Sequence, residues 1–258
     1  MPTSSPDRPS RAALDRPTPS STRTLARIAG VLFIITFVTA IAGALLYDPV
    51  LHNRDYIAGA GADNRVFLGA LMELLLIIAN IGTALALFPI LKRQNEALAL
   101  GYVAARVIEC TFIAIGIVSV LAVVTLRQDT AGADGASLVS IGQSLVAIHD
   151  WTFLLGPGFV VGVGNGLLLG YLMYRSGLVP RPMAVQGLIA GPVLCAGGIA
   201  VLFDVIEPDS ALKALAAAPE FVWELSLGIY LSVKGFKPSP ITSGDTRPGG
   251  VDAGLSAA

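Results

Sequence analysis

Six long apolar runs constrain the fold of this chain more than any other feature of its sequence. A helix needs about 20 apolar residues to cross the hydrocarbon of a bilayer, and it bonds its own backbone polar groups internally. The runs show no alternation with a period of two, which argues against a barrel. The sequence therefore predicts an all-α membrane protein, a six-transmembrane-helix bundle with spans at about 28–46, 66–91, 97–126, 151–174, 183–203 and 217–233.

The composition supports this class and excludes others. The chain is 54% hydrophobic and 14% charged, whereas soluble domains are about 25% charged. The net charge is −1, and the sequence has no basic domain and no zinc-finger spacing. We therefore expect the lipid bilayer as a partner and no nucleic acid. Cys110 and Cys195 lie within apolar runs, which indicates small core residues rather than a disulfide.

The segments outside the spans predict tails and links of different kinds. Residues 1–24 are rich in Pro, Ser, Thr and Arg and have no apolar period, which predicts a disordered tail. A second disordered tail is predicted at 238–258, so the six-helix domain covers 25–237. Tight links on one side make spans two and three, and spans four and five, antiparallel neighbours. The other side has the longer loops, at about 47–65, 127–148 and 204–216.

Lysine and arginine are concentrated on the side of the two tails. That side carries Arg8, Arg11, Arg16, Arg23, Arg27, Lys92, Arg93, Arg175, Arg181, Lys234, Lys237 and Arg247. The opposite side carries Arg54, Arg65, Arg127 and Lys213. Because cytoplasmic loops are enriched in these residues, we predict that both termini are cytoplasmic.

Charged residues inside the apolar runs are the candidate functional groups. Arg106 and Glu109 stand one helical turn apart in the third run, and Glu73 lies in the second. Each such charge costs about 2.5–3.5 kcal/mol near the centre of a membrane helix. We therefore expect these side chains to face the bundle interior, where residues at i and i+3 can pair.

Polar residues on neighbouring spans extend this group into a candidate site. We predict a cavity that opens to the outside, with Arg106 near its floor. His149 and Asp150 are placed at the outer interface, at the start of the fourth span, where Asp150 can also cap the helix. The predicted ligand-binding or polar cluster comprises Glu73, Asn80, Tyr102, Arg106, Glu109, His149, Asp150 and Glu224.

Three functions remain open at this point. Acids outnumber the single buried arginine, which favours binding or transport of a small solute or cation. In a second interpretation the charges only clamp helices in a structural or partner-organising protein. In a third, Glu109 and His149 serve an intramembrane enzyme that acts on lipid. We predict no cofactor and no metal, since His52 and His149 are the only histidines and cannot form a three-histidine zinc site.

Glycines crowd the fourth run. Gly158, Gly162, Gly166 and Gly170 recur at a spacing of four, and Gly187 and Gly191 do so in the fifth run. This pattern predicts a closely packed pair of helices. An alternative is that Pro157 and Pro192 break these helices and expose backbone groups to a cavity.

Several short motifs together resemble a known family. They are ARIAG before the first span, the Arg106-x-x-Glu109 face, the turn YRSGLVPRP at 174–182, and the pattern from Glu224 to Phe236. Over roughly 25–237 the chain resembles the bacterial membrane proteins grouped as domain of unknown function 4386. One departure is Pro182, where an aromatic residue is expected. The resemblance implies a multi-pass protein of the bacterial cytoplasmic (inner) membrane and supplies no activity.

Overall fold

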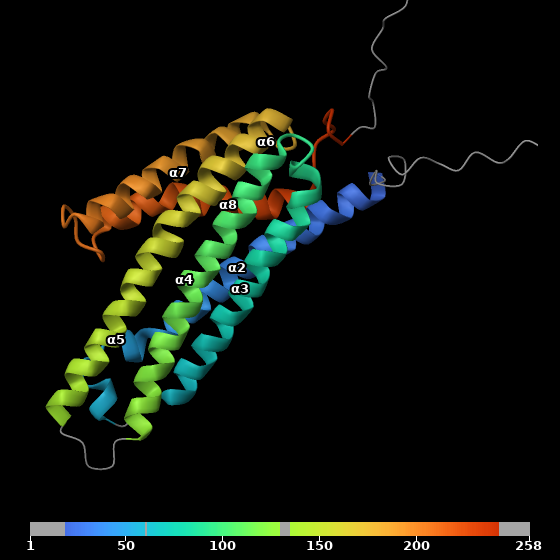
Figure 1. The fold of residues 1–258 in the computed structure, drawn as a ribbon. Coiled ribbons are helices and arrows are strands. Elements are labelled where there is room, and N and C mark those ends of the chain that lie inside the picture. The colour runs from blue at the N-terminus through green and yellow to red at the C-terminus, as the bar shows by residue number, and fades with distance from the viewer. Residues whose placement is uncertain (1–18, 60, 130–134, 243–258) are drawn as a thin grey trace, which may run out of the picture.

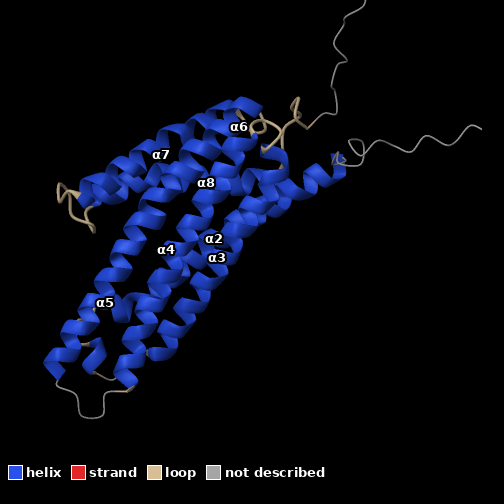
Figure 2. Cartoon of the chain, viewed as in Figure 1, coloured by secondary structure: helices blue, strands red, loops and turns tan. Residues whose placement is uncertain are grey.

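The computed structural model describes residues 19–59, 61–129 and 135–242, and these residues form a bundle of helices without any strand (Figures 1 and 2). The first two long helices are joined through a short 3-10 helix. In chain order the elements are α2 (Pro19–Leu51), η1 (Tyr56–Ala58), α3 (Asp63–Leu91), α4 (Glu96–Gln128), α5 (Gly135–Leu155), η2 (Gly156–Val160), η3 (Gly162–Leu169), α6 (Gly170–Ser176), α7 (Arg181–Leu202) and α8 (Ala211–Val233).

Six helical segments are long and apolar enough to cross a membrane, with α5, η2, η3 and α6 forming one of them. This confirms the prediction of a multi-pass helical membrane protein. Successive segments alternate in direction, so the described N- and C-terminal parts lie together (Figure 1). We call this the terminal end of the bundle and the opposite end the loop end. The placement of the terminal end in the cytoplasm remains a prediction.

Several helix ends follow from local chemistry. The Asn95 side chain accepts a hydrogen bond from the Leu98 N–H at 3.0 Å, and Ser210 caps α8 in the same way. Gly177, with a φ of 67°, terminates α6 in the left-handed conformation that glycine adopts at low cost. Pro182, the departure noted in the sequence, lies in the first turn of α7, where a missing N–H costs nothing.

The helices extend beyond the apolar runs that predicted them. Residues 135–148 belong to α5, so the predicted long loop at 127–148 is wrong. The helix continues because the segments α2 to α5 reach past α7 and α8 at the loop end, where α5 still packs on α4 and η1 (Figure 1). Residues 19–24, assigned to a disordered tail, are part of α2. The Lys237 N–H donates to the Leu178 carbonyl, and residues 243–258 lie outside the described residues.

The fourth membrane segment changes its helical type in the middle. From Gly156 to Leu169 it is π-helical apart from Val161, while α7 runs through Pro192 without a break. Pro157 has no N–H to donate to the preceding turn, and π-helical turns often lie at functional sites. Neither proline therefore breaks its membrane segment. The fourth segment, however, changes from α-helical to π-helical geometry in its middle.

The apolar core has two parts with a polar zone between them. On α3 the loop-end core includes Val66 and Leu76, and the terminal-end core includes Ala84 and Leu87. Asn80 of α3 and Arg106 and Glu109 of α4 lie between these two groups. Both cysteines are free thiols, as predicted. The fold thus places a polar layer at mid-length of the bundle.

Candidate functional site

Two helices bring three polar side chains together in this layer. The Arg106 Nη1 atom donates to Glu109 Oε2 at 2.7 Å, and Asn80 Nδ2 donates to Glu109 Oε1 at 2.9 Å. Arg106 also donates from Nη2 to Asn80 Oδ1, which closes a triangle. Arg106 is 3% exposed and Glu109 is 4% exposed. The expectation that these charges face the interior is therefore confirmed.

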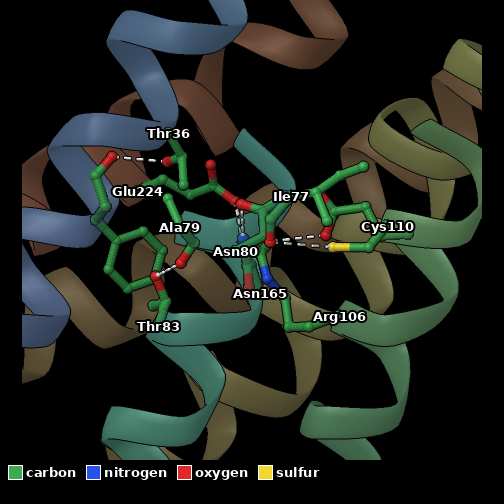
Figure 3. Close-up of polar contacts among 11 residues, drawn as sticks. Thr36, Ile77, Ala79, Asn80, Thr83, Arg106, Cys110, Asn165 and Glu224 are labelled. Carbon is green, nitrogen blue, oxygen red and sulfur yellow. Dashed lines mark hydrogen bonds and ion pairs between the residues drawn. The ribbon is translucent and has the colours of Figure 1, made fainter. Parts of the chain in front are cut away.

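The α8 helix and the π-helical segment add a second set of polar groups. Asn165 Nδ2 donates to Glu224 Oε1, and the Trp223 Nε1 atom donates to the Asn165 carbonyl at 3.0 Å. Figure 3 draws Asn80, Arg106, Asn165 and Glu224 close together in the interior. The two sets therefore form one site in the interior of the bundle.

Glu220 lies one turn before Glu224 on α8 and is 3% exposed. Both of its carboxyl oxygens are buried and have no hydrogen-bond partner among the described residues. Its Oε2 atom would lie 2.9 Å from a β-carbon at Gly166, the residue that follows Asn165 in η3. We define the central cluster as Asn80, Tyr102, Arg106, Glu109, Asn165, Glu220 and Glu224.

Glycines let the backbone approach this cluster closely. A β-carbon at Gly166 would lie 2.3 Å from the Gly191 Cα and 2.9 Å from Glu220 Oε2. A β-carbon at Gly187 would lie 2.6 Å from the Trp223 ring. The prediction of a closely packed glycine stripe between the fourth and fifth spans is therefore confirmed. The absence of these side chains creates the space that Trp223 and Glu220 occupy.

The structure separates Glu73 and His149 from Arg106. Glu73 lies two turns, or about 10 Å, along α3 from Asn80. His149 packs against Gly116, two turns along α4 from Glu109. The Glu109–His149 pair required by the lipid-enzyme hypothesis is therefore not assembled. Glu73 and His149 instead lie near Tyr47 of α2.

At the loop end a cleft of about 200 Å³ lies between η1 and α5. Arg54, Tyr56 and Asp150 are among the residues that line it, and no member of the central cluster does. Arg127 ties η1 to α3, donating to Asp63 and to the Gly59 carbonyl. Burial and a hydrogen bond to Asp63 raise the pKa of the Tyr56 phenol to about 12. An opening from outside to Arg106 remains a prediction.

Sequence reasoning did not select Asn165, Glu220 or Tyr47. Glu220 could have been found, because it stands four residues before Glu224 and so shares its helical face. Asn165 is the lone amide in a glycine-rich membrane segment, which is also a usable signal. Nothing in the sequence around Tyr47 distinguishes it from an interfacial aromatic residue.

The fold and the buried site together define a multi-pass helical membrane protein with a polar cluster at the centre of its bundle. A family model described as Domain of unknown function (DUF4386) matches residues 28–235, and the chain belongs to this family. The match confirms the resemblance inferred from the short motifs. No curated protein and no solved structure matched the chain.

Proposed function

We propose that the protein binds a small cation, or a small cationic solute, at the central cluster and carries it across the bacterial cytoplasmic membrane. The central cluster holds the carboxyls of Glu109, Glu220 and Glu224 and one guanidinium, that of Arg106. A buried, unpaired charge is costly, so a surplus carboxyl holds either a proton or another cation. Exchange of one for the other couples solute movement to proton movement.

Glu220 is the observation that carries this proposal. A carboxyl that only clamped helices would be matched to donors, as Glu109 is matched to Asn80 of the neighbouring α3 and to Arg106 of its own helix. Glu220 instead has two oxygens without a donor in the described part of the chain. Oxygen atoms of this kind are the ligands that hard cations prefer.

The predicted topology gives the site a direction. Glu220 precedes Glu224 on a helix that begins at the loop end, so it lies nearer to the predicted exterior. A cation arriving from outside would meet Glu220 first and the Arg106–Glu109 pair afterwards. The fixed positive charge of Arg106 then limits the cations that the site can bind to the number that the surplus carboxyls can balance.

Tryptophan fluorescence can test binding at this position. The chain has two tryptophans, and Trp151→Phe leaves Trp223, which contacts Asn165, as the only reporter. Purified protein would be titrated with sodium, potassium or choline chloride at constant ionic strength, and separately with acid. We expect a saturable change for protons and for at least one cation. Glu220→Gln should abolish the cation response, and Glu207→Gln, at an exposed position, should retain it.

A transport measurement separates this function from a purely structural one. Protein in lipid vesicles that contain a pH-sensitive dye would receive a gradient of the cation identified by fluorescence. Proton movement that depends on the cation and is lost in Glu220→Gln supports the proposal. If Trp223 responds to neither cations nor protons, the cluster is a helix clamp and the proposal fails.

A further inference from the structure

The residues that follow α8 fold back over the terminal end of the bundle. Gly235, with a φ of 74°, adopts the left-handed conformation after the last turn of α8, and its N–H donates to the Leu231 carbonyl at 3.2 Å. The chain then continues without a helix as far as the described residues extend (Figure 1). We call residues 235–242 the C-terminal strap.

The strap is bonded to the link between α6 and α7. The Lys237 N–H donates to the Leu178 carbonyl at 2.8 Å, and the Ser239 hydroxyl donates to the carbonyl of Ser176. Ser239 is buried, and its own N–H donates to the Thr242 hydroxyl at 3.0 Å. The middle of the strap therefore has a defined conformation on this link.

The strap also contacts the link between α3 and α4 and the start of α2. Arg93 Nη1 donates to the Ile241 carbonyl at 3.0 Å. Phe236 and Ile241 are partly buried and pack against the terminal-end core. A β-carbon at Gly235 would lie 3.6 Å from the Cγ atom of Arg23 in α2. One short segment thus joins the two links that close this end of the bundle.

The core beneath the strap has no exposed surface. Leu91 of α3, Leu172 of α6 and Leu178 of the following link are each 0% exposed. A cation bound at the central cluster can leave toward the terminal end only if the helices separate there. Packed helices separate by hinge or shear movements of whole segments, and the strap bridges the links between these segments.

We propose that the C-terminal strap is a latch that holds the terminal end closed, and that its release lets the α3–α4 link move away from the α6–α7 link. The inference rests on the proposed function for the use of this opening. A few hydrogen bonds and two partly buried side chains hold the strap. Such a segment opens at a lower cost in free energy than the buried helices beneath it.

Hydrogen exchange of the full chain tests the latch without any substitution. We expect the Lys237 amide to exchange faster than the amide of Leu227, which lies in the buried part of α8, and slower than an unprotected amide. Exchange as slow as that of Leu227 would show that the strap is a permanent part of the bundle. Exchange at the unprotected rate would show that the strap holds nothing closed.

A double variant weakens the strap in the full chain. Arg93→Gln with Ser239→Ala removes two side-chain donors that bond across the strap. We expect the Lys237 amide to exchange about tenfold faster, since each such bond has a net value near 1 kcal/mol. Lys92→Gln is the matched control, because it removes the same charge from the same link, while the Lys92 side chain lies over the Phe88 ring of its own helix.

Vesicle transport shows whether the latch acts on movement through the bundle. The double variant should move protons under the cation gradient at least about twofold faster than Lys92→Gln, because opening steps often limit turnover. Its Trp223 cation response should be unchanged. Equal exchange at Lys237 in the two variants, or equal transport, overturns the latch. If Trp223 responds to no cation in the chain without these substitutions, the proposed function fails, and exchange at Lys237 alone decides whether the latch stands.

Discussion

The two halves of the central cluster use the same chemistry in opposite ways. In the half built by α3 and α4, Asn80, Arg106 and Glu109 form a closed triangle of hydrogen bonds. In the half built by η3 and α8, Asn165 bonds Glu224, but Glu220 has two buried oxygens without a donor in the described part of the chain. In the first half only the Arg106 Nε atom has no partner among the described residues, whereas in the second half a whole carboxyl has no donor.

This difference bears on the choice between a clamp and a site. A satisfied buried network fixes helix positions, while a group left without partners is costly unless something binds it. The clamp and the site can therefore coexist, with Arg106 common to both. If this interpretation holds, substitutions in the first half change mainly stability, and substitutions in the second change mainly binding.

The largest loss of stability is expected from removing one member of the Asn80–Arg106–Glu109 triangle. Arg106→Met leaves Glu109 buried with only Asn80 as a partner, and we expect a loss of about 3–5 kcal/mol. The double variant Arg106→Met with Glu109→Leu removes both charges and should lose much less. Thermal unfolding in detergent, followed by tryptophan fluorescence, compares the two. A double variant less stable than the single variant would contradict the clamp.

The half of the central cluster that contains Glu220 depends on contact between the backbones of η3 and α7. Gly166→Ala places a β-carbon 2.3 Å from the Gly191 Cα, so one segment must move. We expect a loss of about 1–3 kcal/mol, the usual cost of overpacking. Gly101→Ala is the matched control, because its nearest neighbour would be Leu168 Cδ1 at an ordinary 3.6 Å. Equal unfolding temperatures for the two variants would show that the close approach is unimportant.

A glutamate-to-glutamine change in each half compares them directly. Glu109→Gln weakens the ion pair and gives Asn80 a neutral acceptor, for an expected loss of about 1–2 kcal/mol. Glu220→Gln replaces a carboxyl that has no hydrogen-bond donor to lose, so it should cost less stability than Glu109→Gln. Chemical unfolding of both variants, beside the Trp223 cation titration, checks this. Greater destabilisation by Glu220→Gln than by Glu109→Gln would reverse the assignment of the halves.

Much of this fold follows from the sequence because the membrane imposes strong constraints. The apolar runs predict the six membrane segments, and the cost of a buried charge predicts that Arg106 and Glu109 face inward. The glycine spacing predicts the contact that Gly166 makes with Gly191. Each of these predictions depends on a residue spacing or on a free-energy cost that acts within one helix or one pair of helices.

The remaining features depend on several elements together. The π-helical stretches Gly156–Val160 and Gly162–Leu169 contain Pro157 and several glycines, and Trp223 of α8 donates to the Asn165 backbone carbonyl, a combination that no single sequence pattern encodes. Glu73 lies about two turns along α3 from Asn80, and this depth, which depends on how α3 packs on its neighbours, keeps it outside the central cluster. The helical start at Gly135 arises because α5 packs on α4 and η1 beyond the apolar runs.

An ion pair at the loop end gives the smallest expected effect and sharpens the comparison. Arg127 and Asp63 have the same chemistry as Arg106 and Glu109, but both side chains are 16% exposed, against 3% and 6% for the inner pair. Arg127→Met leaves Asp63 with donors from Tyr56 and Gln128 and with access to water.

We expect Arg127→Met to cost about 1 kcal/mol or less, because exposure screens the charge that the substitution leaves behind. Thermal unfolding beside Arg106→Met, at low and at high salt, is the measurement. The Arg127→Met effect should shrink with salt, and the Arg106→Met effect should not, since buried pairs are screened little. A similar loss for both variants would show that burial does not set the difference, and the Arg106 triangle would then have no special role in holding the bundle.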